Sequence, residues 1–122
     1  MAIQVQWHDK SARILLCTVL GAWSVAEFDA AYREMIKLTR QTNDKIHLIF
    51  DLHRSQVPDT EAYRGLIPVS PFIAYALMVY DRQSYESAEL IAHLLHKAFD
   101  LPIDEASSII EAEAMIANLQ RA

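Results

Sequence analysis

Three polar side chains lie at the ends of two apolar stretches, and their types and spacing could support chemistry. Asp51 and His53 stand at the end of the stretch 46–52, and Asp81 follows the stretch 72–80. Residues two apart on a strand point to the same face, and ligands of open α/β sheets bind where parallel strands end. A histidine that titrates near neutrality, beside two carboxylates, could hold a cation or a hydroxyl group.

The alternative is structural, and we favour it. In that interpretation the three side chains cap the following helices and pair with Arg54 and Arg82. No third type of catalytic residue is near, and no glycine lets a backbone approach a substrate closely. The sequence therefore predicts no enzyme activity and no catalytic residue.

The remaining metal-binding and nucleophilic candidates are isolated. His93 and His96 have the helical spacing that allows two imidazoles to share a metal, but a zinc site needs more ligands. Cys17 lies in an apolar stretch, where a cysteine behaves as a small buried hydrophobe. Nucleotide-binding loops need clustered glycines, and the chain has only Gly21 and Gly65. We therefore expect no metal and no cofactor.

The elements that would position these residues alternate along the chain. Two hairpin-joined strands are predicted at 3–7 and 12–20, with Gly21 ending the second. A helix over 25–42 is predicted next, because Ser24 to Glu27 form a capping box and Trp23 and Phe28 occupy the two positions of a hydrophobic staple.

The second half of the chain repeats the alternation of strand and helix. The predicted elements are a buried strand at 46–52, a short helix at about 59–68, a buried strand at 72–80, a helix at about 84–98, a weak strand at 103–106 and a final helix from 108. The order is ββαβαβαβα. It predicts one α/β domain over residues 1–122, with helices packed on a mixed, mostly parallel five-stranded sheet in which only the opening hairpin is antiparallel.

Composition excludes several kinds of partner. The net charge is −5 and the eleven Lys and Arg residues are scattered, so no basic stripe is present to bind nucleic acid. The longest apolar run, 72–80, is too short to cross a bilayer. The start of the chain lacks a signal-peptide pattern, and a lone cysteine cannot form an intramolecular disulfide. We expect a cytoplasmic protein with no transmembrane segment.

Several strings, in this order, resemble the SpoIIAA-like branch of the STAS fold. Gly21–Phe28 matches the pattern Gly-x-x-Ser/Thr-x-x-Glu-Phe that follows the second strand, and Asp51-Leu52 matches the pair that ends the next strand. Residues 113–116 match loosely the Glu-x-Ala-aromatic-Leu of the last helix. The resemblance covers nearly the whole chain. It implies a regulatory domain similar to anti-sigma-factor antagonists, which bind other proteins.

The resemblance also implies a phosphorylation position at Thr60. Asp59-Thr60 lies eight residues beyond Asp51, where the family carries Asp-Ser at the start of a helix, and a phosphate is favourable at a helix N-terminus. The family continues Ser-Gly-Leu-Gly, whereas this chain continues with Glu61 to Arg64. We therefore favour an ordinary helix cap for Asp59 and Thr60.

Two functions follow as expectations. The first is a non-enzymatic interaction domain that binds an unknown protein through the surface around His53, Asp59, Thr60 and Tyr63, with a homodimer possible. The second is a carrier of a small lipophilic ligand in a crevice that Trp23, Phe28 and Tyr32 would line beneath the first two helices. A hydrolytic or metal-dependent site at Asp51, His53 and Asp81 is the weakest of the three interpretations.

Overall fold

The computed structural model describes residues 3–40, 45–56, 73–99 and 103–121. Its elements in chain order are β1 (Ile3–Asp9), β2 (Ile14–Ala22), α1 (Val25–Thr39), β3 (Ile46–Gln56), β4 (Ile73–Val79), the 3-10 helix η2 (Arg82–Ser84), α2 (Tyr85–Phe99), β5 (Ile103–Ala106) and α3 (Ile109–Arg121). The short helix predicted at about 59–68 lies outside the described residues.

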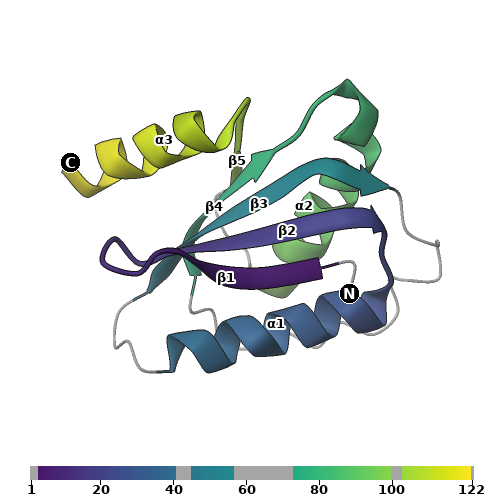
Figure 1. Ribbon diagram of the computed structural model, residues 1–122, viewed down its shortest axis with the longest axis horizontal. Helices are drawn as coiled ribbons and strands as arrows, with labels where there is room; N and C mark the ends of the chain where they lie inside the picture. The colour runs from purple at the N-terminus through teal and green to yellow at the C-terminus, as the bar shows by residue number, and fades with distance from the viewer. Residues whose placement is uncertain (1–2, 41–44, 57–72, 100–102, 122) are drawn as a thin grey trace.

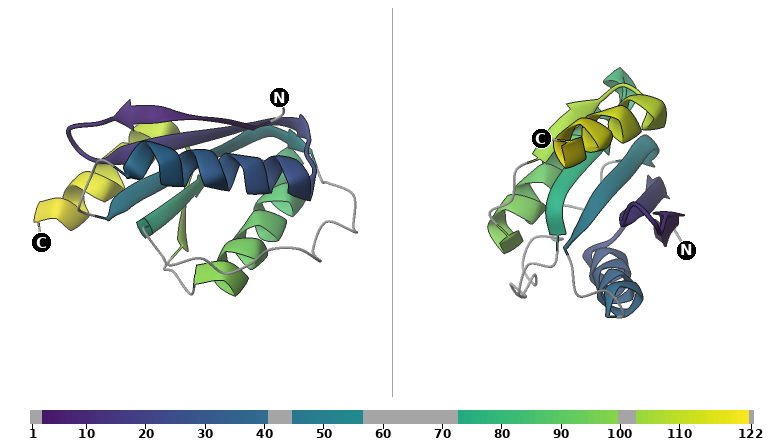
Figure 2. Two further views of the ribbon diagram at one scale, coloured as in Figure 1. Left: turned by 90° about the horizontal axis from the view of Figure 1, so that it is seen from below. Right: turned by 90° about the vertical axis from the view of Figure 1, so that its left-hand side faces the viewer.

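The five strands form one sheet in the order β1-β2-β3-β4-β5. β1 pairs with β2 in antiparallel fashion, and every other pair is parallel. Helices α1 and α2 cover one face of this sheet and α3 covers part of the other (Figures 1 and 2). The mixed, mostly parallel α/β fold expected from the order of elements is therefore confirmed.

Each face of the sheet has its own apolar core. On the α1 and α2 side, Leu48 and Phe50 of β3 pack with Phe28 and Met35 of α1 and with Ile91 of α2. The opposite core is smaller, and it joins sheet residues to helix residues of α3, among them Ile49, Leu77, Ala112 and Ile116. Strand β3 is thus buried on both faces, as its continuous apolar stretch predicts.

The start of α1 follows the local sequence closely. The Ser24 hydroxyl accepts a hydrogen bond from the Glu27 amide (3.1 Å), and the Glu27 carboxylate accepts one from the Ser24 amide (3.2 Å). The rings of Trp23 and Phe28 lie 5.8 Å apart between centroids. The predicted capping box and hydrophobic staple are both present.

Several predicted boundaries are wrong by two to four residues. Strand β2 starts at Ile14 and continues through Gly21, whose φ is +70°, to Ala22. Helix α1 ends at Thr39, whose hydroxyl donates to the carbonyl of Met35 (2.9 Å). The largest difference concerns β3, which runs on to Gln56 because its pairing with β2 resumes beyond an irregularity.

Candidate functional site

The site is built where β3 extends beyond its neighbour β4. The last pair between these strands is Asp51 with Val79. On its other side β3 keeps pairing with β2, because Leu20 lies opposite Arg54 and Ala22 opposite Gln56 after a shift in register. The end of β3 therefore has a neighbouring strand on one side, and helix η2 contacts it.

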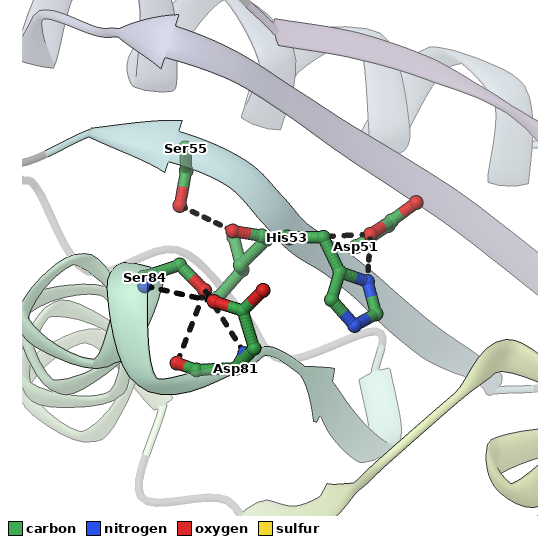
Figure 3. Close-up of polar contacts among 6 residues, drawn as sticks. Asp51, His53, Ser55, Asp81 and Ser84 are labelled. Carbon is green, nitrogen blue, oxygen red and sulfur yellow. Dashed lines mark hydrogen bonds and ion pairs between the residues drawn. The ribbon is translucent and has the colours of Figure 1, made fainter.

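Asp51 and His53 contact each other on this extension, as their spacing predicts. The His53 Nδ1 lies 3.1 Å from the Asp51 Oδ1, and the His53 amide donates to the same oxygen at 3.3 Å (Figure 3). Both side chains are partly accessible, with 38% of His53 and 25% of Asp51 exposed. The fully buried Leu52 between them points to the opposite core. When Nδ1 carries the proton it donates to Asp51, which orients the ring and leaves Nε2 as an acceptor.

A hollow of about 360 Å³ lies beside this pair. Its lining comes from two adjacent strands: Thr18, Val19 and Leu20 of β2, and Asp51, His53 and Arg54 of β3. The polar members are a hydroxyl, a carboxylate, an imidazole and a guanidinium. We name the residues Thr18, Leu20, Asp51, His53 and Arg54 the β3-end surface.

The β3-end surface lies on the part of the sheet that α3 leaves uncovered. Ile49 and Val79 belong to the core beneath α3, and Asp51 follows Ile49 on the same face of β3. Helix α3 leads away from β5 along the other part of this face (Figure 1). The surface can therefore offer hydrogen bonds and charges to a molecule that approaches from this side.

Asp81 is placed near the end of β4 but serves a different purpose. Its carboxylate accepts hydrogen bonds from the amides of Gln83 (2.9 Å) and Ser84 (3.2 Å), and its own amide donates to the Ser84 hydroxyl (3.1 Å). It is the N-cap of η2, and Figure 3 shows it turned toward Ser84 rather than toward His53. The structural interpretation of Asp81 as a helix cap is supported.

Two of the three residues of the hydrolytic or metal-dependent interpretation are thus together. Within the described residues, no group of three or more His, Cys, Asp or Glu side chains is placed to hold a metal ion. Asp59, Thr60 and Tyr63, which the sequence also marks, lie outside the described residues.

The three residues of the expected ligand crevice are packed in the core between α1, α2 and the sheet. Trp23, Phe28 and Tyr32 are 3%, 4% and 7% exposed. The Trp23 Nε1 donates to the hydroxyl of Ser87 on α2 at 3.1 Å. Burial raises the pKa of Tyr32 to about 12. These three side chains are therefore packed as part of the core, and they do not line an open crevice.

Thr18 and Arg54 are members of the β3-end surface that sequence reasoning missed. Thr18 is the one polar residue within the apolar stretch 14–20, which is the signal that could have marked it. Arg54 could not be found in this way, because its place opposite Leu20 depends on the shift in register between β2 and β3.

Among the described residues, no helix has both the length and the apolar character needed to span a bilayer.

Comparisons with known proteins identify the fold. No family model matches the sequence, and no curated protein is detectably similar to it. Among solved structures, the chain is similar to an uncharacterised protein of the DUF3478 family with a SpoIIAA-like fold from Shewanella loihica PV-4. The alignment covers 94% of this chain and 92% of that chain, with a TM-score of 0.62 and 10% sequence identity. The likeness extends over nearly the whole of both chains, and on this evidence the protein has a SpoIIAA-like fold.

Proposed function

We propose that this chain is a non-enzymatic regulatory domain of the cytoplasm that binds another protein through the β3-end surface. The observation that carries the proposal is the position of this surface: the strand β3 continues past β4 and presents Asp51, His53 and Arg54 around a hollow. This surface offers hydrogen-bond donors and acceptors. It also carries a carboxylate, Asp51, and a guanidinium, Arg54. Such a mixture suits the polar side chains of a protein partner.

The state of the polar groups supports binding in preference to catalysis. The Asp81 carboxylate is occupied by the amides of η2, so it does not join the Asp51–His53 pair as a second carboxylate. The nearby Ser55 hydroxyl donates to the Leu52 carbonyl at 2.7 Å, which commits it to the backbone of β3. A general base acting on a substrate needs a further group aligned with the reacting atoms.

The regulatory part of the proposal comes from the sequence that follows β3. Asp59-Thr60 stands three and four residues beyond Gln56, at the position that the SpoIIAA-like resemblance associates with phosphorylation. A partner that binds the end of β3 would be sensitive to charge added there.

Site-specific photo-crosslinking in the native host tests the proposal. A photoreactive phenylalanine analogue replaces Arg54 in one variant and Lys37, an exposed residue of α1, in a control variant. We expect one discrete protein adduct from position 54, absent from position 37 and reduced at least about fivefold by the additional change His53→Ala. Equal adducts from both positions, or none from position 54, would contradict the proposal.

A carrier of a lipophilic ligand is the second candidate, and one observation favours it. A mainly apolar groove of about 470 Å³ runs between the edge strand β1 and helix α1, lined by Ile3, Gln4, Val5, Ala30, Ala31 and Glu34. Its volume falls in the range of small-molecule sites. The groove lies outside the packed residues Trp23 and Phe28, so the ligand would bind next to the core and not within it.

A further inference from the structure

Another polar hollow lies at the β5 edge of the sheet, between the first turns of α2 and the strands β4 and β5. Its volume is about 190 Å³, below the usual range for drug-sized ligands. Two tyrosines and two glutamates provide its polar lining: Tyr80, Tyr85, Glu89 and Glu105. We name these four residues the Tyr–Glu hollow.

The aromatic rings of this hollow form a pair with exposed surface. The ring centroids of Tyr80 and Tyr85 lie 5.9 Å apart and the rings are tilted by 53°. Tyr85 has 48% of its surface exposed, which is unusual for a large side chain of the described part of this protein. The face of an aromatic ring attracts a cation through its quadrupole.

Each tyrosine is tied to a carboxylate of the same hollow. The Tyr85 hydroxyl donates to the Glu89 Oε1 at 2.9 Å, one helical turn farther along α2. Glu105 of β5 contributes, after burial, to raising the pKa of Tyr80 to about 12 through a hydrogen bond and its charge. The carboxylates are thereby held beside the rings, and a carboxylate that accepts one hydrogen bond has capacity for more.

Among the described residues that line this hollow, none carries a positive charge. The remaining lining consists of apolar side chains, among them Ala88 and Ala92 of α2 and Met78 of β4. Small alanine side chains leave room beside the rings. The arrangement therefore combines two negative charges, two ring faces and an apolar floor, which together suit a guanidinium or ammonium group.

We propose that the Tyr–Glu hollow binds an organic cation, presented as an Arg or Lys side chain by a protein partner. This inference rests on the proposed protein-binding function and adds a chemical identity for part of the partner. The net charge of −5 would assist the approach of a basic segment.

NMR titration of the full chain with a short peptide tests the inference. The probe is the capped tripeptide Gly-Arg-Gly, and its control carries citrulline, which is neutral and nearly isosteric with arginine. We expect saturable shifts of amides at 80, 85, 89 and 105 with the arginine peptide and none with citrulline. Equal shifts with both peptides would overturn the inference.

Variants separate the charge and ring contributions. The double change Glu89→Gln with Glu105→Gln should weaken binding at least about fivefold, a difference of about 1 kcal/mol. Glu86→Gln, on an exposed residue of the same helix outside the lining, is the matched charge control and should leave affinity unchanged. Tyr85→Phe keeps the ring and should retain binding, whereas Tyr85→Leu should lose it. Unchanged affinity in the double variant would overturn the proposal.

Two further comparisons identify the source of the cation and separate this inference from the proposed function. Free ethylguanidinium should bind more weakly than the peptide; equal affinity would overturn the assignment to a partner's side chain and leave a small organic cation as the ligand. A protein crosslinked at position 54 without arginine binding at the hollow would overturn this inference alone. Arginine binding without any crosslinked protein would overturn the proposed function.

Discussion

The polar residues that follow the two central apolar stretches take different partners, and these partners decide what each residue can do. Asp51 contacts His53 at 3.1 Å on the same strand, whereas Asp81 accepts two amide hydrogen bonds from the helix that follows it. Both are carboxylates that follow an apolar stretch of the sequence, so residue type alone does not separate them. The difference follows from chain direction, because β3 continues as a strand while β4 gives way to η2.

The environment of His47 allows a prediction of how the free energy of unfolding depends on pH. Burial and the nearby charge of Arg13 lower the pKa of His47, so the folded protein binds this proton less readily than the unfolded chain. Its contribution to stability is therefore complete above the unfolded value of about 6.5 and is lost as pH falls through the folded pKa.

The variant His47→Gln should lose less stability in acid than the wild type does. We expect urea unfolding to show a difference from the wild type in pH dependence that develops below about pH 6.5. Lys37→Gln, at an exposed position of α1, is the control for replacing a basic side chain by glutamine. Identical pH profiles for His47→Gln and the wild type would contradict the assignment.

The hydrogen bond between Trp23 and Ser87 should couple the start of α1 to α2 measurably. The Trp23 Nε1 donates to the Ser87 hydroxyl at 3.1 Å, and both residues are at least 97% buried. Trp23→Phe should cost about 2–3 kcal/mol, because it removes packed volume and leaves the serine without this donor. Ser87→Ala should cost about 1 kcal/mol.

A double-mutant cycle by denaturant unfolding isolates this interaction. The double variant should be less destabilised than the sum of the single variants, by about 0.5–1.5 kcal/mol. Strict additivity would show that the contact contributes nothing beyond the separate burial of the two side chains.

At the scale of elements, the start of α1 could be predicted from the sequence, and the end of β3 could not. The start of α1 depends on Ser24 and Glu27, three residues apart, and the sequence predicts it correctly. The end of β3 depends on pairing with β2 far away in sequence, after a shift in register that no local pattern encodes. That nonlocal dependence hid the place of Arg54 opposite Leu20, whereas the contact between Asp51 and His53 follows from their spacing.

Substitutions of Gly21 should show how much free energy the backbone conformation near the end of β2 costs a residue with a side chain. Its φ of +70° lies in the left-handed region, and an added Cβ would meet no atom within 4 Å. Gly21→Ala should therefore destabilise the protein by about 1 kcal/mol through backbone strain alone.

Gly21→Asn provides the matched comparison, because asparagine tolerates this region better than alanine. Thermal unfolding should rank the wild type first, the asparagine variant second and the alanine variant last. An alanine variant as stable as the wild type would contradict the assigned backbone conformation.

At the scale of the whole molecule, the sheet has a protected centre and exposed edges. β3 lies between β2 and β4, and Ile46, Leu48, Ile49 and Phe50 are all fully buried. β5 is a four-residue edge strand with a single neighbour. The sheet order agrees with the alternation of strands and helices in the sequence, because consecutive elements usually lie side by side.

Hydrogen exchange should reproduce this difference between centre and edge. Amides of β3 between 46 and 51 should exchange most slowly, near the rate of global unfolding, and those of β5 should exchange through local opening. Mass-spectrometric exchange of the intact chain followed by proteolysis measures both. Slower exchange in β5 than in β3 would contradict the strand order.

The two candidate functions also differ at this scale, because one places the binding surface at the end of β3 and the other along the groove between β1 and α1. Native mass spectrometry of the protein, freshly purified from its own host under conditions that retain ligands and subunits, compares them directly. We expect a partner subunit bound to the chain, with no small molecule attached, and loss of that partner in the variant with His53→Ala and Arg54→Ala. A co-purifying lipophilic mass at one per chain, unaffected by those changes, would contradict protein binding at the β3-end surface and assign the function to the β1–α1 groove.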